Sequence, residues 1–220
     1  PAKGWGSAVE VPKQVRDLVD AGRLKALKTW RKDITKALSA SQSLRLTALA
    51  RRVEVLWEMT LRRLRVAEAE ASRRIDLWGR ETQDTAGSTV SREDIEAYLA
   101  APGSAYRRLR LVMDAWCALW FWPLTTDVTP PSLDKWLGAL EGLLGKQVKD
   151  AKGTDGTLVD ASSWAELETM EELELGLAGA RRVQSVVDEY EWLTVVQEVA
   201  EAQGFFHWEL DFATVFARGG

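Results

Sequence analysis

Apolar or small residues recur every three or four positions through one long stretch, which predicts a single long helix. The stretch begins near Ser41 or Ser43, either of which can cap a helix. The residues on the predicted inner face are Leu46, Leu49, Val53, Leu56, Thr60, Leu64, Ala67, Ala71, Ile75 and Trp78. Steps of three and four keep them on one side of an α-helix. At 1.5 Å per residue this helix would be about 50 Å long, more than a compact bundle covers fully.

Capping and breaking residues predict shorter helices on both sides of the long one. Ser or Pro stands at the expected helix starts, at Pro12, Ser91, Ser104, Ser132 and Ser163. Ser91 and Asp94 have the spacing of a capping box. The expected helices lie over 12–21, 23–38, from 91, 104–122, 132–144, from 163 and over 180–202, and Gly204 ends the last. Polar residues predict a linker over 81–90 and a mobile loop over 145–162.

The residues after Gly204 differ in composition from the rest of the chain. Phe205-Phe206-His207-Trp208-Glu209-Leu210 is rich in aromatic residues and follows a helix-stopping glycine. We therefore expect a short strand or extended arm over 205–210. The predicted fold class is mainly α, an elongated helical bundle with one long helix. The predicted division is a helical domain over 1–203 and a separate segment over 204–220.

Charge is distributed unevenly along the chain. Residues 1–80 contain 18 Lys and Arg against 9 Asp and Glu, whereas residues 81–220 contain 11 against 24. Such a separation indicates a polyanionic partner for the basic half, or two faces of one protein that attract each other. Both interpretations are open at this point.

Three arginine pairs recur in the long helix at intervals of eleven residues, at Arg51-Arg52, Arg62-Arg63 and Arg73-Arg74. Eleven residues are close to three turns, so the pairs would stack along one face about 16 Å apart. These six arginines are candidate contacts with a DNA backbone, because guanidinium groups bind phosphate oxygens well. The alternative, which we favour, is a solvated helix face with intrahelical pairs such as Glu58 with Arg62 and Glu70 with Arg74.

Two other clusters have a structural interpretation as well as a functional one. Trp116, Trp120, Phe121 and Trp122 resemble a platform for stacking bases. The four-residue step from Trp116 to Trp120, among Leu109, Met113 and Leu119, instead predicts packing in the core. The acidic residues Glu166, Glu168, Glu171, Glu172 and Glu174 predict a solvated face.

The residues that carry chemistry are few. The single histidine, His207, and the single cysteine, Cys117, exclude a Cys/His zinc site and an internal disulfide. Neither a Gly-rich phosphate or cofactor loop nor a nucleophile elbow occurs. We therefore expect no catalytic, cofactor-binding or metal-binding residue, and a structural role for His207. One cysteine, no signal peptide pattern and no apolar run of roughly 20 residues favour a cytoplasmic protein without a membrane partner.

The C-terminal residues resemble a segment of large DNA adenine methyltransferases. Residues 205–216 are similar to Phe-His-Trp-Glu-Leu-Glu-Phe-Pro-Glu-Val-Phe of the methylases of type IIG restriction–modification and bacteriophage-exclusion systems. The chain differs at Asp211, Ala213 and Thr214, where Glu, Pro and Glu are usual. Residues 114–123, Asp-Ala-Trp-Cys-Ala-Leu-Trp-Phe-Trp-Pro, resemble a stretch upstream in these enzymes.

This resemblance implies a non-catalytic helical fragment of a larger, S-adenosylmethionine-dependent enzyme. In that family the segment precedes the catalytic Asn-Pro-Pro-aromatic loop, and an Asp-Pro-Ala-Cys-Gly-Ser-Gly cofactor loop lies upstream. The parent would methylate adenine in double-stranded DNA after flipping the base, with or without a fused endonuclease. The fragment would support the rest of the methyltransferase chain and contact the DNA backbone. The alternative is a helical protein–protein docking module unrelated to DNA.

Overall fold

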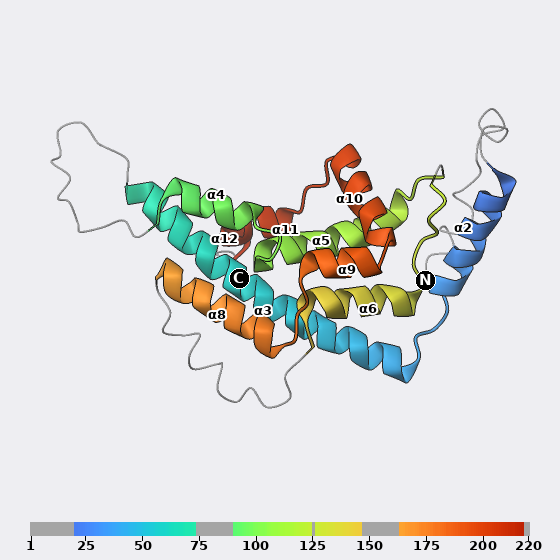
Figure 1. Ribbon diagram of the computed structural model, residues 1–220, viewed down its shortest axis with the longest axis horizontal. Coiled ribbons are helices and arrows are strands. Elements are labelled where there is room, and N and C mark those ends of the chain that lie inside the picture. The colour runs from blue at the N-terminus through green and yellow to red at the C-terminus, as the bar shows by residue number, and fades with distance from the viewer. Residues whose placement is uncertain (1–19, 74–89, 125, 147–162, 218–220) are drawn as a thin grey trace.

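The computed structural model describes residues 20–73, 90–124, 126–146 and 163–217. Every regular element within these ranges is a helix, and the helices form an elongated bundle around one long member (Figure 1). The prediction of a mainly α, elongated bundle is confirmed. Among the described helices none is both long and apolar enough to cross a membrane. Most of the predicted helix over 12–21 and of the predicted segments 81–90 and 145–162 lies outside the described residues, and Ala21, the predicted end of that helix, instead begins the next helix.

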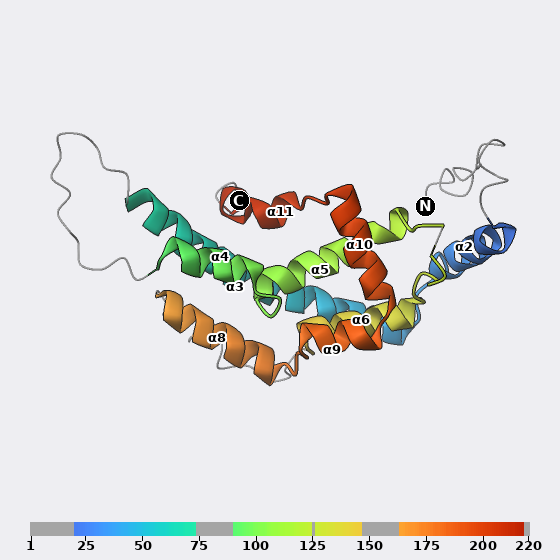
Figure 2. The same ribbon diagram turned by 45° about the horizontal axis from the view of Figure 1, so that its top comes forward.

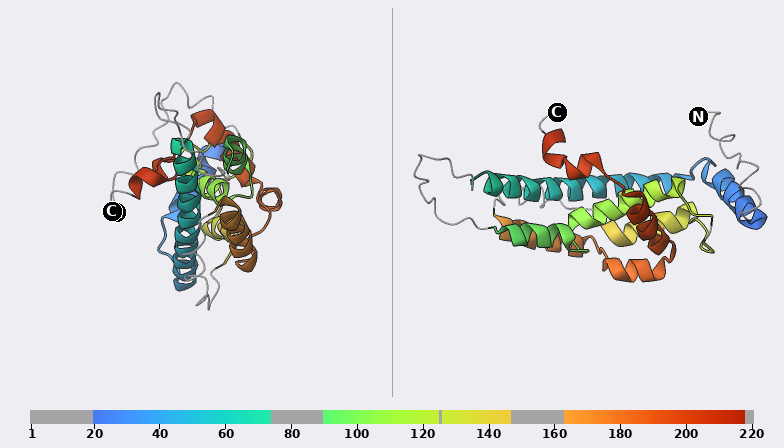
Figure 3. Two further views of the ribbon diagram at one scale, coloured as in Figure 1. Left: turned by 90° about the vertical axis from the view of Figure 1, so that its left-hand side faces the viewer. Right: turned by 90° about the horizontal axis from the view of Figure 1, so that it is seen from above.

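The long helix α3 (Ala40–Arg73) has 34 residues and runs through most of the molecule (Figure 3). Its buried apolar side includes Leu49, Leu56 and Met59. That side packs against three helices, α5 (Ala105–Cys117), α6 (Leu133–Leu144) and α8 (Trp164–Leu177). The core therefore lies along α3, which is the common neighbour of segments far apart in sequence.

The predicted helix caps are confirmed at four serines. The side chains of Ser91, Ser104, Ser132 and Ser163 accept hydrogen bonds from the backbone N–H three residues later. Ser91 and Ser163 also form capping boxes, with Asp94 and with Glu166. Because each cap satisfies an N–H that the first turn leaves free, these serines fix the starts of α4 (Arg92–Ala100), α5, α6 and α8.

The predicted helix over 180–202 is wrong in one respect, because the structure contains two helices there. α9 (Val183–Glu189) ends before Tyr190, and α10 (Trp192–Gln203) leaves in another direction. α9 packs closely on α6, where a Cβ added at Gly142 would lie 3.0 Å from Val186 Cγ2. The buried sides of α9 and α10 thus contact different neighbours. Gly204, with φ 63° and ψ 49°, ends α10 as predicted.

Helix α2 (Ala21–Ile34) lies at one end of the molecule, away from α8 (Figures 1 and 2). No residue of α2 is buried. The helix is attached by Trp30, whose Nε1 donates to the carbonyl of Pro131 at 2.6 Å. Arg23 donates to the carbonyl of Leu124 and pairs with Asp127. These contacts hold α2 at the periphery of the molecule in a fixed position. The helix begins and ends earlier than the predicted range 23–38.

The predicted strand over 205–210 is wrong. Residues 205–207 are non-helical, and two short helices follow, α11 (Trp208–Asp211) and α12 (Ala213–Phe216). Asp211 Oδ2 accepts from the backbone N–H of His207 at 3.0 Å, which satisfies a donor at the start of α11. α11 packs against α5 and α12 against α3, and no sheet is available in the described residues to pair with a strand.

Candidate functional site at the C-terminal segment

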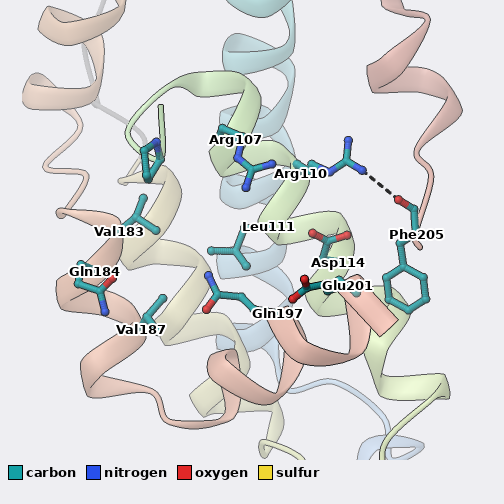
Figure 4. Close-up of a pocket in the computed structure, with 12 residues that line it drawn as sticks. Arg107, Arg110, Leu111, Asp114, Val183, Gln184, Val187, Gln197, Glu201 and Phe205 are labelled. Carbon is teal, nitrogen blue, oxygen red and sulfur yellow. Dashed lines mark hydrogen bonds between the residues drawn. The ribbon is translucent and has the colours of Figure 1, made fainter. Parts of the chain in front are cut away.

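A cavity of about 500 Å³ lies between α5, α10, α9 and Phe205 (Figure 4). Its apolar wall includes Leu111, Val183 and Val187. The polar residues that line it are Arg107, Arg110, Asp114, Gln184, Gln197 and Glu201. The cavity therefore adjoins the place where the C-terminal segment, residues 205–217, meets the helical body.

Asp114 and His207 form a buried pair beside this cavity. Asp114 Oδ1 lies 2.7 Å from His207 Nε2, and the two side chains are only 13% and 5% exposed. Asp114 belongs to α5, whereas His207 immediately precedes α11. A carboxylate at this distance orients the imidazole ring and favours a proton on Nε2. The pair links the C-terminal segment to α5.

A second polar cluster, formed by residues of α5 about one and two turns before Asp114, is centred on Asp211. Tyr106 donates its hydroxyl to Asp211 Oδ1 at 2.7 Å, and Arg110 Nη1 lies 3.1 Å from the same oxygen. Arg110 Nη2 also donates to the carbonyl of Phe205 at 3.0 Å, as Figure 4 shows. Burial, and then the neighbouring Asp211 carboxylate, raises the pKa of Tyr106. The hydroxyl therefore stays protonated and continues to donate.

The contacts of these groups attach the C-terminal segment to α5. A histidine oriented by a carboxylate activates a nucleophile only when a hydroxyl or thiol lies within hydrogen-bond distance. Cys117 is three residues beyond Asp114, but burial and the Asp114 charge raise the pKa of its thiol, the opposite of activation. No group of three or more metal-ligating side chains occurs in the described residues.

The opposite side of the C-terminal segment is apolar and exposed. The exposed fractions are 50% for Phe206, 65% for Trp208, 42% for Phe212 and 52% for Phe216. Phe206, Trp208 and Phe212 contact one another, with ring centroids 5.1–5.8 Å apart. Exposed aromatic clusters of this kind are typical of surfaces that bind another polypeptide.

The prediction that the other aromatic cluster packs in the core is wrong for three of its four residues. Trp116, Trp120 and Phe121 are 55%, 47% and 53% exposed. Trp122 alone is buried, and its Nε1 donates to the carbonyl of Val128 at 3.0 Å. Phe121 contacts Phe205, so the exposed aromatic surface of residues 116–121 continues toward the C-terminal segment.

Two of the six candidate DNA-contacting arginines are not on the surface. Arg52 is 3% exposed; it donates to the carbonyl of Leu144 and forms an ion pair with Glu174. Arg63 is 2% exposed, and its Nε lies 3.4 Å from Glu171 Oε2. Both side chains face α8 across the core, so the phosphate-contact hypothesis is wrong for them.

The surroundings of Arg63 show how a charge is accommodated there. Its guanidinium carbon lies 4.3 Å and 4.5 Å from the ring centroids of Tyr98 and Trp164. Glu171 accepts from the backbone N–H of Ala105 and from the hydroxyl of Tyr98. The network thereby ties α3, α4, α5 and α8 together. The prediction of a solvated acidic face is wrong for Glu171 and Glu174, which are buried, and correct for Glu166, Glu168 and Glu172, which are exposed.

The other four arginines differ in their surroundings. Arg62 pairs with Glu58 at 2.9 Å, which confirms the predicted intrahelical pair, and Arg51 is exposed. The side chain of Arg73 and the whole of Arg74 lie outside the described residues, as does the predicted pair of Arg74 with Glu70. Contact of these four with DNA stays a prediction.

Comparison with known proteins adds no relative. No protein-family model matches the sequence, and no curated protein or solved structure is detectably similar to it. The resemblance of residues 205–216 and 114–123 to methyltransferase segments is therefore a basis for a proposal.

Proposed function

We propose that this chain is a non-catalytic helical part of an S-adenosylmethionine-dependent DNA adenine methyltransferase of a restriction–modification or phage-defence system. Its role would be to support the catalytic domain and to contact the DNA backbone. The parent enzyme would bind S-adenosylmethionine and methylate adenine in double-stranded DNA. The resemblance of residues 205–216 to the segment before the catalytic loop is the origin of this proposal.

The observation that carries the proposal is the two-sided character of the C-terminal segment. Its inner side is fixed to α5 by the His207–Asp114 pair and by the contacts of Asp211 with Tyr106 and Arg110. Its outer side exposes the aromatic cluster of Phe206, Trp208 and Phe212. A segment that joins a helical domain to a catalytic domain needs both features, a fixed inner side and an apolar outer side for the next domain to cover.

Two experiments test this proposal. The coding sequence on both sides of the chain should encode a Gly-rich cofactor loop upstream and an Asn-Pro-Pro-aromatic loop within about 15 residues after Gly220. A continuous reading frame without these loops would overturn the proposal. The chain itself should not bind S-adenosylmethionine in calorimetric titration, and micromolar binding would contradict its assignment as a non-catalytic part.

A second candidate function is protein–protein docking unrelated to DNA. The exposed aromatic residues of 116–121 and of the C-terminal segment favour it, because large exposed aromatic side chains are enriched at interfaces. Salt dependence separates the two functions. Phosphate contacts weaken steeply as salt rises, whereas a docking module has no duplex binding to lose.

A further inference from the structure

We infer that α2 contacts the phosphate backbone of double-stranded DNA through Lys25, Lys28 and Lys32. This inference rests on the proposed function for its choice of DNA, and it places the contact on a different helix from the arginine pairs of α3. We refer to these three lysines as the lysine face of α2. All three side chains are exposed.

The spacing of the lysines places them on one side of the helix. Steps of three and four residues separate Lys25, Lys28 and Lys32, so they lie within about 60° of the helix circumference at 100° per residue. The row extends about 10 Å along the axis at 1.5 Å per residue. One strand of B-DNA presents a phosphate about every 3.4 Å of axis, so the row spans roughly three phosphates.

The positive charge of this face is not neutralised by the rest of the described chain. Residues 20–36 contain six Lys and Arg but only two Asp. Asp33 pairs with Lys36 at 2.8 Å, and Asp20 caps the helix by accepting from Gly22 N–H. Neither carboxylate therefore neutralises the lysine face. By contrast, Arg45 of α3 pairs with both Asp134 and Glu141.

The attachment of α2 gives this face a defined direction. Leu24, Leu27 and Trp30 are half-buried on the inner side, where Trp30 donates to the carbonyl of Pro131. The lysines, on another side of the helix, are thus held outward by a helix whose position is fixed. A preoriented row of cations loses less conformational freedom on binding a polyanion than a row on a free chain does.

The same geometry argues against an anionic membrane as the partner. A helix that lies in a membrane surface needs an exposed apolar side to insert beside its basic side. The apolar side chains of α2 are instead turned toward the body, and the most exposed of its large hydrophobic residues, Ile34, is 38% exposed. A binding mode that uses phosphate contacts alone, without insertion, fits DNA better.

The test measures binding of the whole 220-residue chain to a labelled duplex oligonucleotide by fluorescence anisotropy over a series of KCl concentrations. The triple variant Lys25→Gln, Lys28→Gln, Lys32→Gln should bind at least about tenfold more weakly at low salt. The slope of log affinity against log salt should fall by about 2 to 3, since each phosphate contact contributes roughly 0.9. Two duplexes of unrelated sequence should be affected equally.

A matched control removes the same charge elsewhere. Arg65, Lys146 and Arg182 are exposed residues outside α2, and the variant Arg65→Gln, Lys146→Gln, Arg182→Gln should keep the affinity and the slope of the unaltered chain. Gln and Lys have similar helix propensities, so circular dichroism should show both variants folded.

Several outcomes would overturn the inference. These are unchanged binding by the α2 variant, equal weakening by the control variant, or absence of duplex binding by the unaltered chain. Binding to phosphatidylserine vesicles without binding to DNA would assign the face to a membrane and overturn it as well. Failure of the inference is distinguishable from failure of the methyltransferase proposal, because that proposal is tested separately by the flanking coding sequence and by titration with S-adenosylmethionine.

Discussion

Helices α3 and α2 both carry closely spaced cations, but the two sets occupy opposite environments. Arg52 and Arg63 of α3 lie in the core with carboxylate partners from α8. Lys25, Lys28 and Lys32 of α2 are exposed and project from a peripheral helix. The difference teaches that basic spacing alone does not identify a polyanion-binding face. Only the direction of the side chains separates a cation that holds the fold together from one that is available to a partner.

The largest effect on stability should come from removing a buried ion pair of α3. Replacing Arg63 by Met leaves Glu171 without its counter-ion, and removal of one partner of a buried pair costs about 3–5 kcal/mol of unfolding free energy. Replacing Arg62, which pairs on the surface with Glu58, should cost at most about 1 kcal/mol. Urea unfolding followed by circular dichroism measures both. Equal losses would contradict the assigned roles.

The Arg63→Met variant should also depend on pH in a defined direction. Burial raises the pKa of Glu171 above its ordinary value, although Arg63 opposes this. A carboxyl group whose pKa is raised by folding favours the folded state below its unfolded pKa, and that stability is lost as the pH rises through the raised pKa. Without Arg63 the pKa should rise further. Unfolding curves at acidic and neutral pH should therefore show a smaller deficit for the variant at acidic pH.

A somewhat smaller effect is expected at Gly145, which ends α6 next to the carbonyl that Arg52 contacts. Its φ is 78°, and an added Cβ would lie 2.7 Å from the backbone oxygen of Ala178. Gly145→Ala should cost about 2–3 kcal/mol, because strain and a backbone clash combine. Gly179 also has positive φ but open space around it, so Gly179→Ala should cost only about 1 kcal/mol. Equal thermal unfolding midpoints for the two variants would contradict the clash.

A moderate effect is expected where the C-terminal segment is attached. Asp114→Asn keeps an oxygen acceptor for His207 but loses the charge, at a cost of about 1–2 kcal/mol. The pKa of Cys117 is raised mainly by burial and secondly by the Asp114 charge, and the same change removes this second cause. The pH profile of thiol alkylation should therefore move to lower pH. His207→Gln keeps the Asp114 charge, so in this control the midpoint of the pH profile of Cys117 alkylation should not change. An equal shift in both variants would show that opening of the C-terminal segment, and not loss of the charge, changes the thiol pKa.

The smallest effect on stability should come from the exposed side of the comparison. The triple replacement of Lys25, Lys28 and Lys32 by Gln should leave the thermal unfolding midpoint unchanged, because these side chains make no ion pair with the described residues. A clear fall in the midpoint, measured by differential scanning calorimetry, would show that the lysines hold α2 in place. In that case the lysines of α2 would stabilise the fold, as Arg52 and Arg63 of α3 do, and would not be available to a partner.

Local signals in the sequence are sufficient for several helix starts but insufficient for the buried charges of the helices. Ser104 and Ser132 are caps because the rule depends only on neighbours along the chain. Periodicity places Val53 and Leu64 on the inner face of α3, whereas their neighbours Arg52 and Arg63 are the more deeply buried residues. Adjacent helical residues differ by 100°, so a shift of one position decides which member of each arginine pair meets α8.

The C-terminal segment and the break in 180–202 depend on contacts that no local pattern contains. Residues 205–210 have the composition of a strand, but no sheet edge is present in the described chain, and Asp211 instead caps a helical turn at His207. Likewise, no Gly or Pro separates α9 from α10 at Tyr190 and Glu191. The Asp114–His207 pair joins residues 93 apart in sequence, and the cavity is likewise lined by segments distant in sequence, so helical periodicity predicts neither.

The pairing of Arg52 with Glu174 has a consequence for synthesis on the ribosome. The two residues are 122 positions apart, so the arginine emerges long before its carboxylate partner. At a translation rate of about 5–20 residues per second, Glu174 would be synthesised roughly 6–24 s after Arg52. Until then its inner side combines exposed apolar residues with arginines that have no counter-ion from α8. The inner side of α3 therefore becomes fully buried only after the second half of the chain has been synthesised. A chain truncated before α8 would leave this side exposed, and we expect chaperones to retain such a product and proteases to degrade it.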